Sequence, residues 1–279
     1  MDELATFTYI VWQDRYLEEK PFQVFSPTAD DAAASTNLVF EDGPLQHIND
    51  ARGHEKEYSL NQNGFAFCKH DVKDGIFNTA VQVEKQYLPE MERLLRQHVQ
   101  DVTEVYFFDW RIRRNKDITK SVIDANDKMQ HLLPARHVHI DQTPSAAVGR
   151  TLLHLPEKAD RLLRGRVRII NLWRPLVHEV QDRPLALCDM RSVSADDVVE
   201  ADHVRKQYNG SNYYLKFSSK YRWHYLSRQT RDEVTMIQMF DSEMEGVSGC
   251  PHSSFDLTHP PEKAIKRESI EVRALVFSS

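Results

Sequence analysis

The second half of this sequence is a succession of short strand patterns, and this feature constrains the fold more than any other. Apolar residues there alternate with polar ones or run together, and turn residues separate the runs. Helix and strand do not alternate strictly, as they do in a parallel α/β sheet. The pattern therefore predicts a mainly β protein with flanking helices and a jelly-roll or related barrel core. The predicted strands are 166–173, 185–189, 213–217, 222–226, 233–240 and 269–277.

The first half mixes strands with two helical patterns. Residues 87–99 carry apolar side chains at helical spacing, with Pro89 in the first turn, and the pattern turns helical again at 145–164. No internal repeat or Gly/Ser-rich linker divides the chain. We therefore expect residues 1–279 to form a single domain, in which an N-terminal strand and helix extension precedes the barrel. Strands are predicted at 6–12, 65–69, 102–112 and 137–141, and a surface loop at 21–35.

The composition argues against several function classes. Glycine is scarce, at 9 of 279 residues, and neither GxGxxG nor GxxxxGK[ST] occurs to bind phosphate through backbone amides. The net charge of −6 and the pI near 6.1 disfavour a nucleic-acid partner or an anionic membrane. The three cysteines lie outside any CxxC pair, which disfavours a disulfide framework or zinc ribbon. Because we find no long apolar span and no leader pattern, we expect a cytoplasmic protein with reduced thiols.

The segment RHVHIDQ at 136–142 is the strongest candidate for chemistry. Strand residues two apart share a face, so His137, His139 and Asp141 can converge on one point. An HxD pair completed by a distant histidine forms the two-histidine, one-carboxylate triad, which binds Fe(II) and leaves coordination positions open. His252, or its rival His259, offers the distant ligand.

His137 leaves a second interpretation open. Two imidazoles from the HVH sequence and a third histidine form a ligand set typical of catalytic zinc, which serves hydrolysis or lyase chemistry. Both interpretations use His139, and spacing alone does not choose between them.

The last predicted strand has an unusually polar face. Arg267, Ser269 and Arg273 occupy odd-numbered positions and therefore point the same way. A guanidinium group beside a hydroxyl matches a carboxylate, so Arg267 and Ser269 can hold the far carboxylate of a dicarboxylic co-substrate such as 2-oxoglutarate. The alternative is a solvated strand face with an Arg–Glu pair.

A set of short motifs spans nearly the whole chain. They lie at 48–53, 63–65, 137–142, 171–176, 184–192, 222–225, 240–242, 251–255 and 267–277. As a set they resemble the fungal family of gibberellin-desaturase-like and hydroxylase/desaturase proteins of secondary metabolism, which is related to the cephamycin methoxylation protein.

This resemblance implies a double-stranded β-helix of the Fe(II)/2-oxoglutarate oxygenase type. It implies that His139, Asp141 and His252 bind the iron, that His137 is a strand neighbour, and that His259 is a loop residue. Fe(II) and the co-substrate 2-oxoglutarate would then serve hydroxylation or desaturation of a small molecule.

The resemblance also implies roles for the polar strand and the aromatic residues. Arg267 with Ser269 becomes the 2-oxoglutarate clamp, and Arg273 is its reserve. An apolar, aromatic-lined pocket suits a lipophilic secondary metabolite. The candidates for lining or bracing that pocket are Phe107, Trp110, Trp173, Arg174 and Tyr225.

A function from another class stays open. Biosynthetic families of this kind also use the barrel as a pericyclase or cyclase, because positioning of a reactive substrate accelerates ring closure without a metal. The triad would be vestigial in such an enzyme. The sequence shows no loss of a triad residue, which favours the oxygenase, and it does not indicate an oligomeric state.

Overall fold

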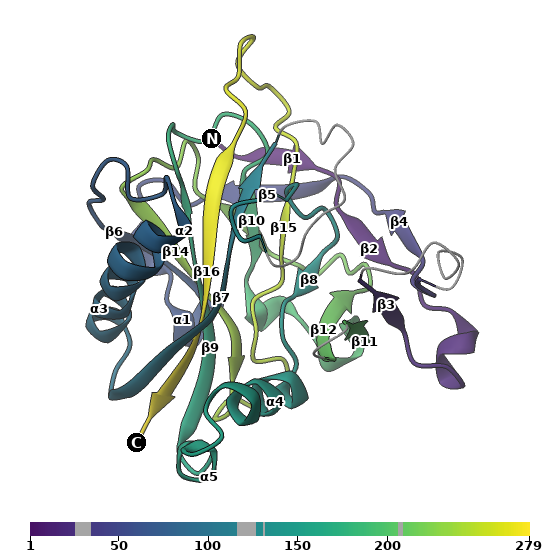
Figure 1. Cartoon of the computed structure of the whole chain (residues 1–279). Helices are drawn as coiled ribbons and strands as arrows, with labels where there is room; N and C mark the ends of the chain where they lie inside the picture. The colour runs from purple at the N-terminus through teal and green to yellow at the C-terminus, as the bar shows by residue number, and fades with distance from the viewer. Residues whose placement is uncertain (26–34, 116–126, 131, 206–208) are drawn as a thin grey trace.

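The computed structural model describes residues 1–25, 35–115, 127–130, 132–205 and 209–279. In this part of the chain, most strands belong to a five-stranded and a nine-stranded sheet, and two further strands form a small sheet of their own. The two large sheets enclose a shared apolar core, and helices lie outside the strands (Figure 1). The prediction of a mainly β protein with flanking helices is confirmed.

The five-stranded sheet contains the longest strands and is antiparallel throughout. Its order, β6-β14-β9-β16-β7, places the C-terminal strand between β9 and the edge strand β7. The strands are β6 (Phe65–Lys69), β14 (Glu233–Asp241), β9 (Arg166–Pro175), β16 (Glu268–Ser278) and β7 (Val102–Arg114).

Both faces of this sheet carry apolar side chains, because successive side chains of β16 point in turn into two different cores. Ile270 and Val272 pack into a core shared with the helix α3 (Leu88–His98), while Leu275 and Phe277 join the core between the two sheets. Burial of each such side chain contributes about 1.5–3 kcal/mol. The sheet is therefore held from both sides.

Helix α3 covers the outer face of the five-stranded sheet (Figure 1). Met91, Leu94 and Leu95 lie on one side of the helix and are buried, and Pro89 occupies the first turn as predicted. The helix continues from α2 (Ala80–Gln82) through a π-helical turn, Val83–Tyr87. The helix predicted at 87–99 is thus confirmed to within a residue or so at each end.

The nine-stranded sheet contains shorter strands, and its centre is where β15 and β8 lie side by side. Its order is β1-β5-β13-β10-β15-β8-β12-β11-β3. In that order the strands are β1 (Glu3–Ala5), β5 (Gln46–Asp50), β13 (Trp223–Tyr225), β10 (Leu185–Cys188), β15 (His252–Ser254), β8 (His139–Ile140), β12 (Gly210–Leu215), β11 (Val198–Val204) and β3 (Phe22–Val24).

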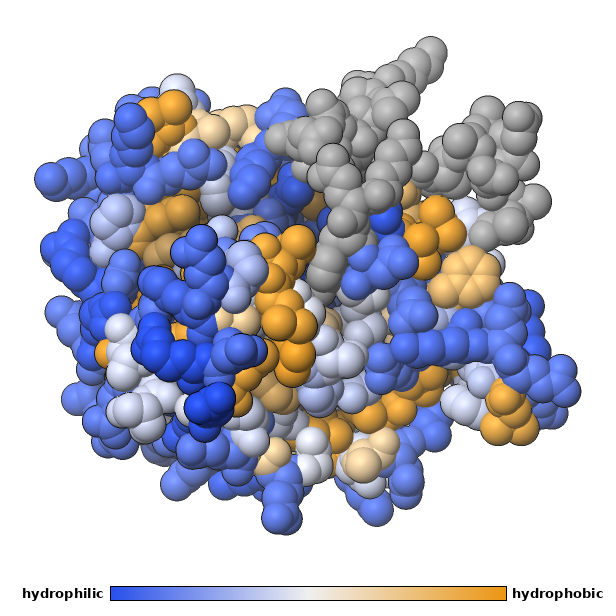
Figure 2. Space-filling view, turned by 60° about the horizontal axis from the view of Figure 1, so that its bottom comes forward, coloured by the Kyte–Doolittle hydropathy of each residue, from blue (hydrophilic) through white to orange (hydrophobic). Residues whose placement is uncertain are grey.

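The helical pattern at 145–164 forms two helices rather than one. Thr143 caps α4 (Pro144–His154) by accepting a hydrogen bond from a backbone amide, and α5 (Ala159–Leu162) follows. Pro156 lies between them, and a proline disfavours helical geometry in the residue before it. Figure 2 turns the α4 end of the molecule forward and shows a largely hydrophilic face with small apolar patches. The exposed apolar residues of α4 are Val148, Leu152 and Leu153.

Two predicted strands are shorter than expected, because the chain changes sheets. The segment predicted at 6–12 contains only β2 (Thr8–Ile10), which pairs with β4 (Phe40–Asp42) in the two-stranded sheet. The segment predicted at 137–141 is a strand only in β8. The predicted loop at 21–35 includes β3, and its residues 26–34 lie outside the described part of the chain.

The remaining elements are short. These elements are α1 (Leu60–Asn63) and the 3-10 turns Asp14–Leu17, Glu55–Glu57, Met190–Ser192 and Ala195–Asp197. No helix in the described residues is long and apolar enough to cross a membrane.

Candidate metal centre

Three side chains with metal-binding atoms meet beside the core between the sheets. His139 on β8 and His252 on β15 are direct partners in the antiparallel ladder. Asp141 follows directly after β8. The candidate ligand atoms of these three residues lie within 4.8 Å of one another, and no other such group of His, Cys, Asp or Glu occurs in the described residues. Strand pairing thus joins the HxD pair to its distant histidine.

Each histidine ring is fixed by a hydrogen bond on the side away from the cluster. Nδ1 of His139 lies 2.8 Å from the carbonyl oxygen of His137, and Nδ1 of His252 lies 3.1 Å from that of Cys250. A carbonyl oxygen only accepts, so each Nδ1 carries a proton and each Nε2 keeps a free lone pair. Nε2 of His139 lies 3.4 Å from Oδ1 of Asp141. A histidine that binds a metal through Nε2 needs this tautomer.

The charges of the cluster also suit a cation. Burial, together with the nearby His139, lowers the pKa of His252 to about 4, so its imidazole is neutral at physiological pH. Burial alone would raise the pKa of Asp141, but the positive charge of Arg273 holds that pKa well below its usual range. The cluster therefore offers a carboxylate and a neutral imidazole without prior loss of protons.

The second carboxylate oxygen of Asp141 is held from the five-stranded sheet. Oδ2 accepts hydrogen bonds from Nδ2 of Asn171, at 2.7 Å, and from Nε of Arg273, at 2.9 Å. Both donors also bind Glu271: Asn171 Nδ2 lies 2.9 Å from Oε1, and Arg273 Nη2 lies 2.8 Å from Oε2. The four side chains close a ring of hydrogen bonds, which ties the nine-stranded sheet to the five-stranded sheet at the cluster.

The third nitrogen of Arg273 binds a further carboxylate. Its Nη1 donates to Oδ2 of Asp109 at 3.0 Å, because Arg273 and Asp109 are paired residues of β16 and β7. On the other side of β16, Asn171 is the partner of Arg273 in β9. Asn171, Arg273 and Asp109 therefore form a row across three neighbouring strands.

Arg267 and Ser269 are buried, and each has one polar side-chain atom without a hydrogen-bond partner. Arg267 is 4% exposed and Ser269 is 0% exposed. The guanidinium carbon of Arg267 lies 5.5 Å from the ring centre of Trp173, and Nη1 donates to the carbonyl oxygen of Arg183. Nε of Arg267 and Oγ of Ser269 have no hydrogen-bond partner, and no ion pair to Arg267 occurs within the described residues.

The burial of this guanidinium group without a carboxylate partner lowers its pKa. Burial, with the like charge of Arg113 added, lowers the pKa of Arg267 to about 9. The group is therefore a cation at neutral pH with a vacant donor beside a vacant hydroxyl. Such a pair can bind an anion with charge-assisted hydrogen bonds.

Comparison with known proteins agrees with this chemistry. A family model described as an oxidoreductase/YMDC permease-like domain matches residues 7–277. The hydroxylase/desaturase efuI of Hormonema carpetanum is 33% identical over 260 residues, which cover 87% of this chain and 86% of that protein. The Fe(II)/2-oxoglutarate-dependent dioxygenase nvfI of Aspergillus novofumigatus is 33% identical over 237 residues, 82% of each chain. The chain belongs to this fungal hydroxylase/desaturase family.

The fold of the family is known from a solved structure. The iron and alpha-ketoglutarate-dependent endoperoxidase NvfI is 28% identical to this chain and matches it with a TM-score of 0.85. The match covers 100% of this chain and 98% of that chain. The resemblance deduced from the motifs is thus confirmed at the level of family.

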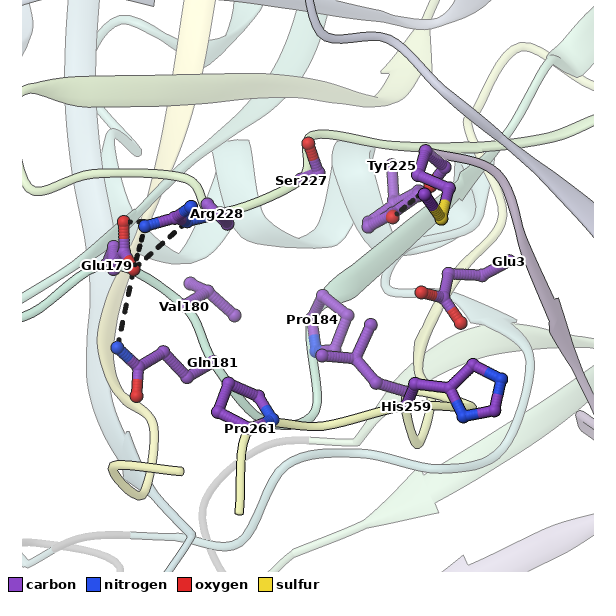
Figure 3. Close-up of a pocket in the computed structure, with 12 residues that line it drawn as sticks. Glu3, Glu179, Val180, Gln181, Pro184, Tyr225, Ser227, Arg228, His259 and Pro261 are labelled. Atoms are coloured by element: carbon purple, nitrogen blue, oxygen red, sulfur yellow. Dashed lines mark hydrogen bonds and ion pairs between the residues drawn. The ribbon is translucent and has the colours of Figure 1, made fainter. Parts of the chain in front are cut away.

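The rival histidines lie outside the cluster of this family member. The ring of His137 stacks on Phe40, with centroids 3.9 Å apart, and only its backbone carbonyl reaches His139. His259 lines a separate pocket of about 430 Å³ that none of the three cluster residues lines (Figure 3). A zinc site with three histidines is not formed among the described residues.

Phe107 and Trp110 lie on the face of β7 that is turned away from the cluster. Both pack into the core under α3. The register of β16 pairs Asp109 with Arg273 and Phe107 with Ala274, so Phe108 is an extra residue in a β-bulge. The bulge shifts the alternation by one, and Phe108 packs on the side of the core between the sheets. Neither Phe107 nor Trp110 is brought to the cluster.

The other pocket candidates divide between two places. Trp173 is buried on the cluster side of β9, next to Arg267. Arg174 points to the opposite face, where its guanidinium donates to the carbonyl oxygens of His70 and Arg231. Tyr225 lines the pocket shown in Figure 3 and donates its hydroxyl to the Met1 carbonyl oxygen at 2.6 Å. The structure therefore brings only Trp173 of this group to the site.

Sequence analysis missed Asn171, Glu271 and Asp109. Asn171 and Glu271 are polar residues within strands that are otherwise rich in buried apolar residues, and Asp109 lies between two aromatic residues of β7; these were the available signals. Polar groups buried in a sheet need partners. Which partners they have depends on strand register, which the sequence pattern alone does not fix.

Proposed function

We propose that this chain is an Fe(II)/2-oxoglutarate-dependent hydroxylase or desaturase that acts on a lipophilic secondary metabolite. The observation that carries the proposal is the cluster of His139, Asp141 and His252, in which both Nε2 atoms and one carboxylate oxygen are free. Membership of the fungal hydroxylase/desaturase family, which includes an Fe(II)/2-oxoglutarate-dependent dioxygenase, gives independent support.

In this proposal the cluster binds the iron. Two imidazoles and one carboxylate are the ligand set of non-haem Fe(II) oxygenases, which leave the remaining coordination positions open. Iron and 2-oxoglutarate, when bound with O2, supply the oxidation of a substrate C–H bond, while 2-oxoglutarate is converted to succinate and CO2. The protein holds the ligands in place and excludes water from the core between the sheets.

Arg267 and Ser269 bind the far carboxylate of 2-oxoglutarate. The vacant Nε of Arg267 and the vacant Oγ of Ser269 support this role, since a buried donor without a partner is costly. Arg273, the reserve candidate, is less suited because three carboxylates already occupy its nitrogens. The 2-oxoglutarate dianion supplies the missing partner of Arg267.

The two facing sheets support a double-stranded β-helix core in a single domain of residues 1–279. Strands of the nine-stranded sheet provide the iron ligands, and β16 of the five-stranded sheet provides the clamp. The long range of the family match, residues 7–277, supports one domain. The site then lies between the two sheets, as ligand sites in jelly-roll proteins do.

Aromatic residues on the cluster side of the five-stranded sheet are suited to bind the substrate. Trp173 and Phe108 lie on that side, and Tyr106 packs there with them. A small metabolite with apolar surface matches such a wall. Phe108 and Tyr106 thus replace Phe107 and Trp110 as pocket candidates.

An anaerobic titration tests the function directly. Metal-free protein is titrated with Fe(II) and then with 2-oxoglutarate, and we expect the charge-transfer absorption that appears when the keto acid chelates bound iron. Asp141→Ala should abolish the absorption, while His259→Ala, the matched control on the rival histidine, should leave it unchanged. A folded parent protein without absorption would reject the oxygenase and favour the metal-independent cyclase.

A further inference from the structure

The ring of hydrogen bonds around Asp141 is unusually complete. Asp141 Oδ2 has two donors, and each of these donors is anchored on the carboxylate of Glu271. Asn171 and Glu271 are 0% and 5% exposed, so water does not compete with these bonds. Oδ1 points instead to the cluster, 3.4 Å from Nε2 of His139.

The orientation of Asn171 follows from its partners. Its amide nitrogen faces two carboxylates, and turning the amide over would bring a carbonyl oxygen against both of them. The amide therefore donates both of its protons inside the ring. Its oxygen has no partner in the described residues.

Each guanidinium nitrogen of Arg273 also donates to a carboxylate. Its Nε binds Asp141, its Nη2 binds Glu271 and its Nη1 binds Asp109, at 2.9, 2.8 and 3.0 Å. A lysine in this place would keep the charge but lose the planar fork that directs three carboxylates at once. The planar shape of the guanidinium group, and not only its charge, therefore holds the three carboxylates in place.

We propose that Arg273 is a positioning residue that limits Asp141 to one metal-binding oxygen. The inference rests on the proposed function of the cluster. Because Arg273 and Asn171 hold Oδ2, only Oδ1 is left for the iron. A carboxylate that binds through one oxygen takes one coordination position, whereas a released carboxylate can chelate through both oxygens and take a second. Arg273 thereby keeps a position open for the keto acid or O2.

Asp109 anchors this arrangement from the edge strand. Its side chain is 21% exposed, against 12% for Arg273, and it also lies 3.5 Å from Nε of Arg111. Among the described residues, the hydrogen-bond and ion-pair partners of Asp109 are Arg273, Arg111 and Lys128, and they include neither Asp141 nor the cluster histidines. Its replacement therefore loosens Arg273 without altering the ligand set.

The test measures Fe(II) affinity and the 2-oxoglutarate charge-transfer absorption of the full chain under anaerobic conditions. For Arg273→Lys we expect Fe(II) affinity to fall about 10- to 100-fold, as is typical when the partner of a metal ligand is removed. At saturating Fe(II), the absorption with 2-oxoglutarate should shift or weaken, because a chelating Asp141 competes for the open position. Asp109→Asn should show the same changes to a smaller extent.

Arg168→Lys is the matched control. Arg168 is a buried arginine of the same sheet, but it donates to Ser278 and to the carbonyl oxygen of Gln100 rather than to the cluster. It should change neither affinity nor absorption. Equal losses in Arg168→Lys would overturn the proposal, as would unchanged behaviour of Arg273→Lys.

If Arg273→Lys does not fold, Asp109→Asn decides the matter, and parent-like affinity and absorption in that variant overturn the proposal. The proposed function fails separately, since it predicts absorption from the parent chain. If the parent chain binds iron and 2-oxoglutarate and the variants bind them equally well, only the role of Arg273 is refuted.

Discussion

Replacing Arg267 with methionine should stabilise the protein that lacks 2-oxoglutarate. Burial lowers the pKa of Arg267 from the ordinary value of an arginine, more than three units higher, to about 9. Each pKa unit corresponds to about 1.4 kcal/mol, so holding the cation in the folded protein costs at most about 5 kcal/mol. Because the folded pKa lies below the unfolded one, the cost is complete below pH 9 and disappears only as the pH rises toward the ordinary pKa of arginine. Methionine keeps much of the volume and removes the charge.

The same substitution should weaken 2-oxoglutarate binding. Removing one partner of a buried, hydrogen-bonded charge pair costs about 2–5 kcal/mol. The affinity should therefore fall roughly 30-fold to several thousandfold. Fe(II) affinity should change little, because Arg267 makes no contact with the three cluster residues.

Two assays check these opposite effects. Thermal unfolding of the metal-free protein should move up by several degrees in Arg267→Met, and anaerobic titration of the Fe(II) form should show the loss of 2-oxoglutarate affinity. Arg174→Met is the matched control: that guanidinium is buried too, but it donates to the carbonyl oxygens of His70 and Arg231, so its loss should lower the unfolding temperature. A lower unfolding temperature for Arg267→Met, or unchanged 2-oxoglutarate affinity, would refute the reasoning.

Two other predictions concern single groups of the site. Ser269→Ala should leave the free energy of unfolding nearly unchanged, because the hydroxyl has no hydrogen-bond partner to lose. The same variant should bind 2-oxoglutarate about 10- to 100-fold more weakly. A calorimetric titration that shows parent-like affinity would count against the clamp. Acid should destabilise the metal-free protein, because the pKa of His252 is about 4 in the folded protein and 6.5 in the unfolded chain. The stability that the neutral imidazole contributes is complete above pH 6.5 and is lost as the pH falls toward 4. The loss is about 2 kcal/mol at pH 5, and urea unfolding of His252→Gln should show a shallower decline; an equal decline would contradict the assignment.

Local patterns were sufficient to predict the β content and helix α3, and they indicated an HxD motif that needs a distant histidine. The choice of His252 over His259 came from the family resemblance. Alternation along a strand is a local property, so the polar face with Arg267 and Ser269 could be deduced before the structure. The choice between Arg267 and Arg273 could not. It depends on which carboxylates lie on β8 and β7, and that is a matter of sheet register.

The pocket residues show a second limit of the sequence pattern. Phe107 and Trp110 were predicted from their aromatic character, but a β-bulge in β7 places both of them under α3. Arg174 was predicted from the family resemblance, and the regular alternation of β9 places it on the face opposite to Trp173. Long-range pairing, rather than local propensity, decides these positions.

The bulge at Phe108 also matters for comparing relatives by alignment. β7 is an edge strand, where one residue can be added or removed without breaking a second ladder. Deleting Phe108 would remove the extra residue and leave the facing of its neighbours unchanged, because Asp109 already pairs with Arg273 and Phe107 with Ala274. A gap of one residue at this point would thus take a single aromatic side chain from the proposed substrate wall and leave the bond between Asp109 and Arg273 in place.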